Sequence, residues 1–111
     1  MNRHKIVCLI GSTKPEWQEQ YRKVNRDLCL AGYVVISVSL FKTDVEDIEK
    51  FRPLLESIHL QKIDMSDLVV LIHKDAVGKN TSDEIEYSKA IAKRVVIFSD
   101  IENTVKEIEG E

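Results

Sequence analysis

The turn Gly11-Ser12-Thr13-Lys14 combines residue types that can bind an anion. The glycine lets a ligand approach the backbone, the two hydroxyl groups can donate hydrogen bonds, and the lysine supplies positive charge. A segment with helical spacing follows, and the N–H groups that open a helix favour negative charge. The turn is neither a GxGxxG fingerprint nor a P-loop. The alternative interpretation is a helix start that Ser12 or Thr13 caps.

A second group of polar residues lies between Asn80 and Tyr87. Within it, Glu84 is expected in the first turn of a helix, where its carboxylate can face a ligand. Thr81 and Glu84 also have the spacing of a capping box, which would exist for helix stability alone. Glu86 lies two residues further on, must face another direction, and is expected on the solvated surface.

The histidines differ in their expected positions. His59 lies eight residues before Asp67, near the end of an expected helix. It is either a half-buried surface residue or a group that reaches the site and titrates near neutral pH. His73 directly follows an apolar run and is the other histidine expected near the site, whereas His4 lies near the chain start and is assigned no role.

Four short apolar runs must form the strands that position these residues, because near-continuous apolar runs are typical of parallel strands covered on both faces. They span residues 6–10, 33–38, 67–72 and 95–98. Helical spacing lies between them and after the last one. Pro15 fits a first helical turn, Gly32 a helix stop, and Pro53 predicts a kink or two shorter helices.

This alternation predicts an α/β protein with a flavodoxin/Rossmann-like three-layer sandwich. We expect a four- to five-stranded parallel sheet of order 2-1-3-4, with helices on both faces, in a single domain over residues 1–111. Such sheets bind ligands at the carboxyl ends of their strands, beside the first strand. The turn at residues 11–14 and the loops after the second and third strands meet at that edge.

Composition limits the classes of partner. The net charge of −3 argues against binding to polymeric nucleic acid, which needs a basic face. The apolar run after the basic N-terminus is short and is expected to be a strand, not a signal peptide or a membrane span. Cys8 and Cys29 are isolated and are expected to be reduced, buried residues of a cytoplasmic protein. No metal ion and no cofactor is expected.

Taken together, these segments resemble the nucleoside 2-deoxyribosyltransferase-like superfamily, and in particular its short members, the 2'-deoxynucleoside 5'-phosphate N-hydrolases. The resemblance covers Ile6 to about Phe98. Three pieces carry it: Gly11-Ser12 after the first strand, Ser66-Asp67-Leu68-Val69-Val70 at the third, and Thr81-Ser82-Asp83-Glu84 ahead of Lys93-Arg94-Val95-Val96. The nine-residue step from Glu84 to Lys93 is similar to the family's spacing.

The resemblance implies that Glu84 is the nucleophile. It would attack the anomeric carbon of a deoxyribose and expel the base, and water or a second base would then take the sugar. The turn at residues 11–14 would hold the 5' end of a nucleoside or nucleotide, with Ser82 and Asp83 also binding substrate. The resemblance also implies a homodimer, and the contact is expected at the apolar residues Phe51, Leu54 and Leu55.

The sequence departs from the family at three positions. Lys14 stands where the hydrolases carry an arginine, Cys8 where the family has an aromatic residue, and His59 where it has an aspartate. A histidine can donate a proton but cannot accept hydroxyl hydrogen bonds as a carboxylate does. Three interpretations follow: an N-glycosidase or deoxyribosyltransferase that uses Glu84 with help from His59, a nucleotide sensor or sequestering protein without catalysis, or a relative in fold only.

Overall fold

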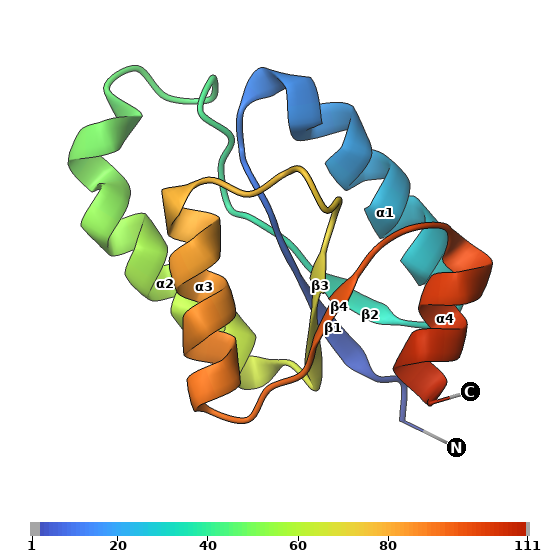
Figure 1. The fold of residues 1–111 in the computed structure, drawn as a ribbon. Coiled ribbons are helices and arrows are strands. Elements are labelled where there is room, and N and C mark those ends of the chain that lie inside the picture. Colours follow the sequence, from blue (N-terminus) through green and yellow to red (C-terminus); the bar gives the residue numbers. More distant parts are fainter. Residues whose placement is uncertain (1–2, 111) are drawn as a thin grey trace.

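The computed structural model describes residues 3–110 and contains one parallel sheet of order β2-β1-β3-β4 (Figure 1). This confirms the predicted α/β class, strand order and orientation. The elements, in chain order, are β1 (Ile6–Ile10), η1 (Pro15–Trp17), α1 (Gln18–Leu30), β2 (Val34–Ile36), η2 (Ile48–Phe51), α2 (Arg52–Met65), β3 (Leu68–Leu71), α3 (Lys79–Ala90), β4 (Val95–Ile97) and α4 (Ile101–Glu109).

Helices cover both faces of the sheet, so the three-layer arrangement is also confirmed. Helices α1 and α4 lie on one face, and α2 and α3 lie on the other (Figure 1). Alternate residues of β1 point to opposite faces: Val7 and Leu9 join the core with α1 and α4, while Cys8 and Ile10 pack with Ile63 of α2. The central strand is therefore buried on both sides, as its continuous apolar sequence predicts.

The strands are shorter than their apolar runs. The run at residues 33–38 pairs with β1 only over Val34–Ile36, because the chain then leaves the edge of the sheet. The runs at 67–72 and 95–98 pair over Leu68–Leu71 and Val95–Ile97. Because the second run leaves the sheet early, residues 38–40 are free to line the cavity described below.

Proline and glycine mark the helix boundaries as predicted. Pro15 is the first residue of η1, and Gly32, with φ +98°, follows the end of α1. Pro53 does not kink a helix: η2 ends at Phe51, α2 begins at Arg52, and the proline occupies the first turn, where its missing N–H leaves no bond unmade. The alternative of two helical segments is therefore confirmed.

Both predictions of side-chain caps are wrong. Helix α3 begins at Lys79 with Gly78 as its N-cap, so Thr81 and Glu84 lie inside the helix and cannot form a capping box. The N-cap residue of η1 is Lys14, and no side chain within residues 3–110 makes a capping hydrogen bond to this helix. The Oγ of Ser12 instead accepts a hydrogen bond from the Lys14 N–H within the turn, at 3.3 Å. Glu84 is consequently beyond the first turn, and another reason must account for its burial.

The two cysteines have different environments. Cys8 is fully buried in the sheet and is free, as predicted. Cys29 is also free but exposed, so the prediction of burial is wrong for this residue. It follows Leu28, whose side chain faces the core, and a step of one residue on a helix turns the next side chain toward solvent.

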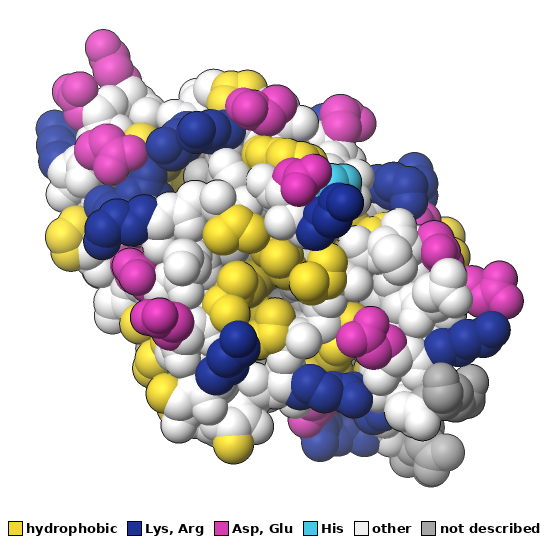
Figure 2. Space-filling view, in the orientation of Figure 1, with side chains coloured by type: hydrophobic (Ala, Val, Ile, Leu, Met, Phe, Trp, Pro, Cys, Tyr) yellow, Lys and Arg dark blue, Asp and Glu magenta, His cyan; other side chains and the backbone are white. Residues whose placement is uncertain are grey.

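Apolar side chains also reach the surface. Phe51, the last residue of η2, is 42% exposed, and Leu54 in the first turn of α2 is 60% exposed, whereas Leu55 is half-buried and faces the cavity. On the edge strand β4, Ile97 is 48% exposed. Figure 2 shows hydrophobic side chains gathered in the middle of the face toward the reader, with charged side chains around them. The homodimer contact expected at α2 stays a prediction. Within residues 3–110, no helix has the length and apolar character needed to cross a bilayer.

Candidate active site

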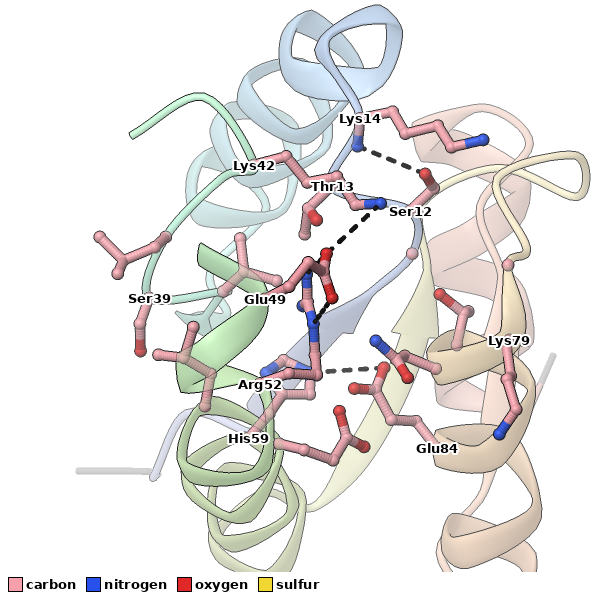
Figure 3. A pocket seen from close by; sticks show the side chains of 18 residues that line it. Ser12, Thr13, Lys14, Ser39, Lys42, Glu49, Arg52, His59, Lys79 and Glu84 are labelled. Carbon is pink, nitrogen blue, oxygen red and sulfur yellow. Dashed lines mark hydrogen bonds and ion pairs between the residues drawn. The ribbon is translucent and has the colours of Figure 1, made fainter. Parts of the chain in front are cut away.

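A cavity of about 400 Å³ opens at the carboxyl edge of the sheet, where strand order predicted a site. Four segments line it: the turn after β1, the loop after β2, η2 with the first two turns of α2, and the start of α3 (Figure 3). The predicted residues Gly11, Ser12, Thr13, Lys14, His59 and Glu84 all lie in its wall. The fold therefore brings most of the predicted site together.

The turn after β1 is held rigidly against its neighbours. Gly11 has φ +153°, and a Cβ added there would lie 2.7 Å from Cγ1 of Ile72. The hydroxyl of Tyr21 donates a hydrogen bond to the Gly11 carbonyl at 2.6 Å. The N–H of Ser12 donates to the Ala76 carbonyl at 2.8 Å, which ties the turn to the loop after β3. Only glycine fits this conformation and space.

Positive side chains from several segments surround the cavity. Lys14 was predicted, and the structure adds Lys42, Arg52 and Lys79. Glu49 lies among them: its carboxylate accepts a hydrogen bond from Arg52 at 2.9 Å and lies 4.0 Å from the Lys42 ammonium (Figure 3). The hydrogen bond from Arg52 is the main cause that lowers the pKa of Glu49. The sequence could have indicated Lys42, because it lies in the loop after the second strand, at the same edge of the sheet as Lys14.

Glu84 and His59 face each other at the buried end of the cavity (Figure 3). Both are 6% exposed, and Oε1 of Glu84 lies 3.9 Å from Nε2 of His59. Below them, Sγ of Cys8 lies 4.0 Å from the same imidazole nitrogen. Since Ser12 lines the same cavity, the glutamate, the histidine and the turn after β1 share one site.

Burial keeps both groups uncharged at pH 7. Burial first, and then the charge and hydrogen bond of Glu56, raise the pKa of Glu84 to about 9. Burial first, and then the positive charge of Lys62, lower the pKa of His59 to about 4. The contact between them is therefore one between a glutamic acid and a neutral imidazole, not an ion pair.

Two further residues of α2 belong to the site and were missed. Glu56 lines the cavity half-buried, and a hydrogen bond joins its carboxylate to the Glu84 carboxyl group. Lys62 donates hydrogen bonds to the Ser37 carbonyl at 2.8 Å and to the Ser39 hydroxyl at 2.7 Å, and so holds the loop after β2. The sequence could have indicated both residues, because Glu56 lies three residues before His59 and Lys62 three residues after it, and side chains three apart on a helix are neighbours.

Other predicted residues lie outside the cavity. Ser82 and Asp83 are exposed, because the helical turn that directs Glu84 inward directs them toward solvent. His73 is likewise absent from the cavity wall, and its Nδ1 accepts a hydrogen bond from the Asp75 N–H at 3.0 Å. Between residues 3 and 110, no group of three or more His, Cys, Asp or Glu side chains is arranged to hold a metal ion.

Comparisons with known proteins bear on the fold. No protein-family model matches the chain, and no curated protein matches its sequence. The solved structure of the Clostridium botulinum CMP N-glycosidase BcmB is similar, with a TM-score of 0.59 and 14% sequence identity over 96% of this chain and 100% of that one. At this identity the likeness concerns the backbone arrangement. The chain is thus a three-layer α/β protein with a fold similar to that of a CMP N-glycosidase.

Proposed function

We propose that this protein cleaves the N-glycosidic bond of a nucleoside or nucleoside 5'-monophosphate, with the Glu84 carboxylate as nucleophile. One observation carries the proposal: a glutamate and a histidine from two helices face each other at the buried end of a cavity whose opposite wall is a turn with the hydroxyl and ammonium groups that suit an anion. The fold similarity to a CMP N-glycosidase supports it.

The binding half of the site follows from the turn after β1. The hydroxyls of Ser12 and Thr13 and the Lys14 ammonium would receive a 5'-phosphate, with Lys42 adding charge from the neighbouring loop. A phosphate held there directs the sugar toward Glu84. The half-buried Leu55 offers apolar surface to the base.

The chemical half uses a covalent intermediate. The ionised Glu84 carboxylate attacks the anomeric carbon, and the bond from that carbon to the base nitrogen breaks as the base takes its electron pair and a proton. Water then hydrolyses the glycosyl ester and frees Glu84, while transfer to a second base would make the protein a transferase. His59, which is neutral, packs beside the Glu84 carboxyl group, with Nε2 3.9 Å from Oε1, and restricts its position.

Nucleotide binding without cleavage is the second candidate function, and a specific observation favours it. At neutral pH the Glu84 carboxyl group keeps its proton, and a protonated carboxyl group is a poor nucleophile. In addition, His59 stands where the resembling family carries an aspartate. If the Glu84 pKa stays high when substrate is bound, Glu84 remains protonated and does not attack the sugar. The protein would then bind a nucleotide without cleaving it, as a sensor or sequestering protein does.

The deciding experiment incubates the protein with ribo- and deoxynucleosides and their 5'-monophosphates and measures free base by chromatography. Base release that is lost in Glu84→Gln supports the glycosidase. Glu86→Gln is the matched control, because Glu86 is an exposed glutamate on the same helix outside the cavity. Calorimetric binding of a nucleotide without base release supports the binding protein. The absence of both binding and release contradicts both proposals.

A further inference from the structure

Glu56 forms a carboxyl pair with Glu84 that the reaction described so far does not use. It lies on α2 one turn before His59, lines the cavity and is half-buried. The Glu84 carboxyl O–H donates a hydrogen bond to the Glu56 carboxylate, so the two groups share one proton.

The proposed reaction needs a proton to move in one direction. The nucleophile must be ionised when it attacks, and a leaving base must gain a proton to depart readily. In this site the proton starts on the group that must lose it. A carboxylate already bonded to that proton, on the wall of the same cavity, can take it and present it to the base.

We propose that Glu56 is a second catalytic residue, which takes the proton of Glu84 and donates it to the leaving base. This inference rests on the proposed glycosidase function. In the first step, Glu84-COOH and Glu56-COO⁻ become Glu84-COO⁻ and Glu56-COOH. The Glu84 carboxylate then bonds to the anomeric carbon, the bond to the base breaks, and the Glu56 proton passes to the base with no change in total charge.

The second half of the cycle returns both groups to their starting state. Glu56, now ionised, removes a proton from the water that attacks the anomeric carbon of the glycosyl ester. The bond between that carbon and the Glu84 oxygen breaks, the oxygen keeps the electron pair, and the sugar leaves with a hydroxyl group. The Glu56 proton then passes back to Glu84, so one water is consumed for each bond that is cleaved.

The surroundings of the two α2 groups favour Glu56 over His59 as the acid. His59 is more deeply buried and neutral, and a neutral imidazole N–H is a very weak acid. Glu56 is only half-buried. Burial first, with Asp83 adding to it, raises its pKa, which suits a carboxyl group that must hold a proton. The hydrogen bond with Glu84, and then the Arg52 charge, oppose that rise, so the acid can also be regenerated as a carboxylate.

The test compares two substrates that share the preferred sugar and differ in how their base leaves. One is the normal deoxynucleoside. The other carries a base that departs without protonation: 7-methylguanine for a purine-cleaving protein, or 5-nitrouracil for a pyrimidine-cleaving one. We expect Glu56→Gln to lower kcat/KM, which reports the steps up to base release, by about 10²- to 10⁴-fold for the normal substrate and to change it less than about fivefold for the activated one. Hydrolysis of the shared glycosyl ester, in which Glu56 is the base, should slow equally for both substrates. Glu84→Gln should lose both activities, and Glu86→Gln neither.

Each other outcome has a distinct meaning. Equal losses of kcat/KM for both substrates in Glu56→Gln, or no loss, overturn the role of Glu56 as the acid while leaving the glycosidase intact. Absence of base release by the unmodified protein overturns the glycosidase and the inference with it. Unfolding midpoints check that the variants fold, and Glu56→Asp provides a second variant: it keeps an acid on a shorter side chain and should recover part of the activity on the normal substrate.

Discussion

Replacing Glu84 by glutamine should change how stability depends on pH. Between its ordinary value of 4.5 and the raised pKa of about 9, Glu84 is protonated in the folded protein and ionised in the unfolded chain. The contribution of Glu84 to the free energy of unfolding is therefore greatest below pH 4.5. It falls by about 1.4 kcal/mol per pH unit as pH rises from 4.5 toward 9. His59 has the opposite effect between pH 4 and 6.5, where only the unfolded chain is protonated.

The effects of Glu84 and His59 on the free energy of unfolding cancel between about pH 4.5 and 6.5. Above pH 6.5 only the effect of Glu84 remains. From pH 6.5 to 8.5, the free energy of unfolding should fall by about 2–3 kcal/mol, which corresponds to a loss of roughly 10 °C in Tm. Glu84→Gln cannot ionise and should lose less than about 1 kcal/mol over this range. Each protein is unfolded with urea at both pH values, and the fluorescence of Trp17, the single tryptophan, reports the transition.

Glu86→Gln is the control and should follow the unmodified protein at both pH values, because its side chain is exposed. If Glu84→Gln loses as much stability as the unmodified protein, ionisation of another group causes the fall. The protonated state of Glu84, and the proton transfer built on it, would then be refuted.

Three further predictions concern the turn after β1 and the surface of α2. Gly11→Ala should lower the free energy of unfolding by about 2–3 kcal/mol, since its Cβ would lie 2.7 Å from the Ile72 side chain at a positive φ; a neutral effect in urea unfolding would contradict the fixed turn. Lys14→Ala should raise the KM for a 5'-monophosphate about tenfold or more and that for the unphosphorylated nucleoside less than twofold; equal effects would place the phosphate elsewhere. Leu54→Glu should convert the predicted homodimer to a monomer in sedimentation, and an unmodified protein that is already monomeric would disprove the dimer.

The sequence was most informative where local pattern and topology agree. Continuous apolar runs separated by helical spacing predicted the parallel sheet of order 2-1-3-4, and strand order then placed Gly11 and Lys14 at the edge where the cavity opens. Element ends were less well predicted. The sequence also fits a capping box at Thr81 and Glu84, but α3 begins two residues earlier, at Lys79, with Gly78 as its N-cap.

Facing directions also required the structure. Ser82 and Asp83 adjoin Glu84 in sequence but point to solvent, because the side that α3 turns to the cavity depends on how the helix packs. Cys29 was misplaced for the same reason on α1. A pattern of residue types describes a helix face, whereas the orientation of that face is a property of the packed layers.

For the turn at residues 11–14, the sequence by itself determined which polar and charged groups are present and at which sheet edge they lie, because residue types and strand order are enough for both. For Glu84, the sequence determined only that a carboxylate is present at a family-like spacing. Tertiary structure decided that α2 and α3 bring it against His59 and Glu56. The physical reason is that a pKa depends on burial and on charges nearby in space, which residues 25 positions or more apart supply only after the chain has folded.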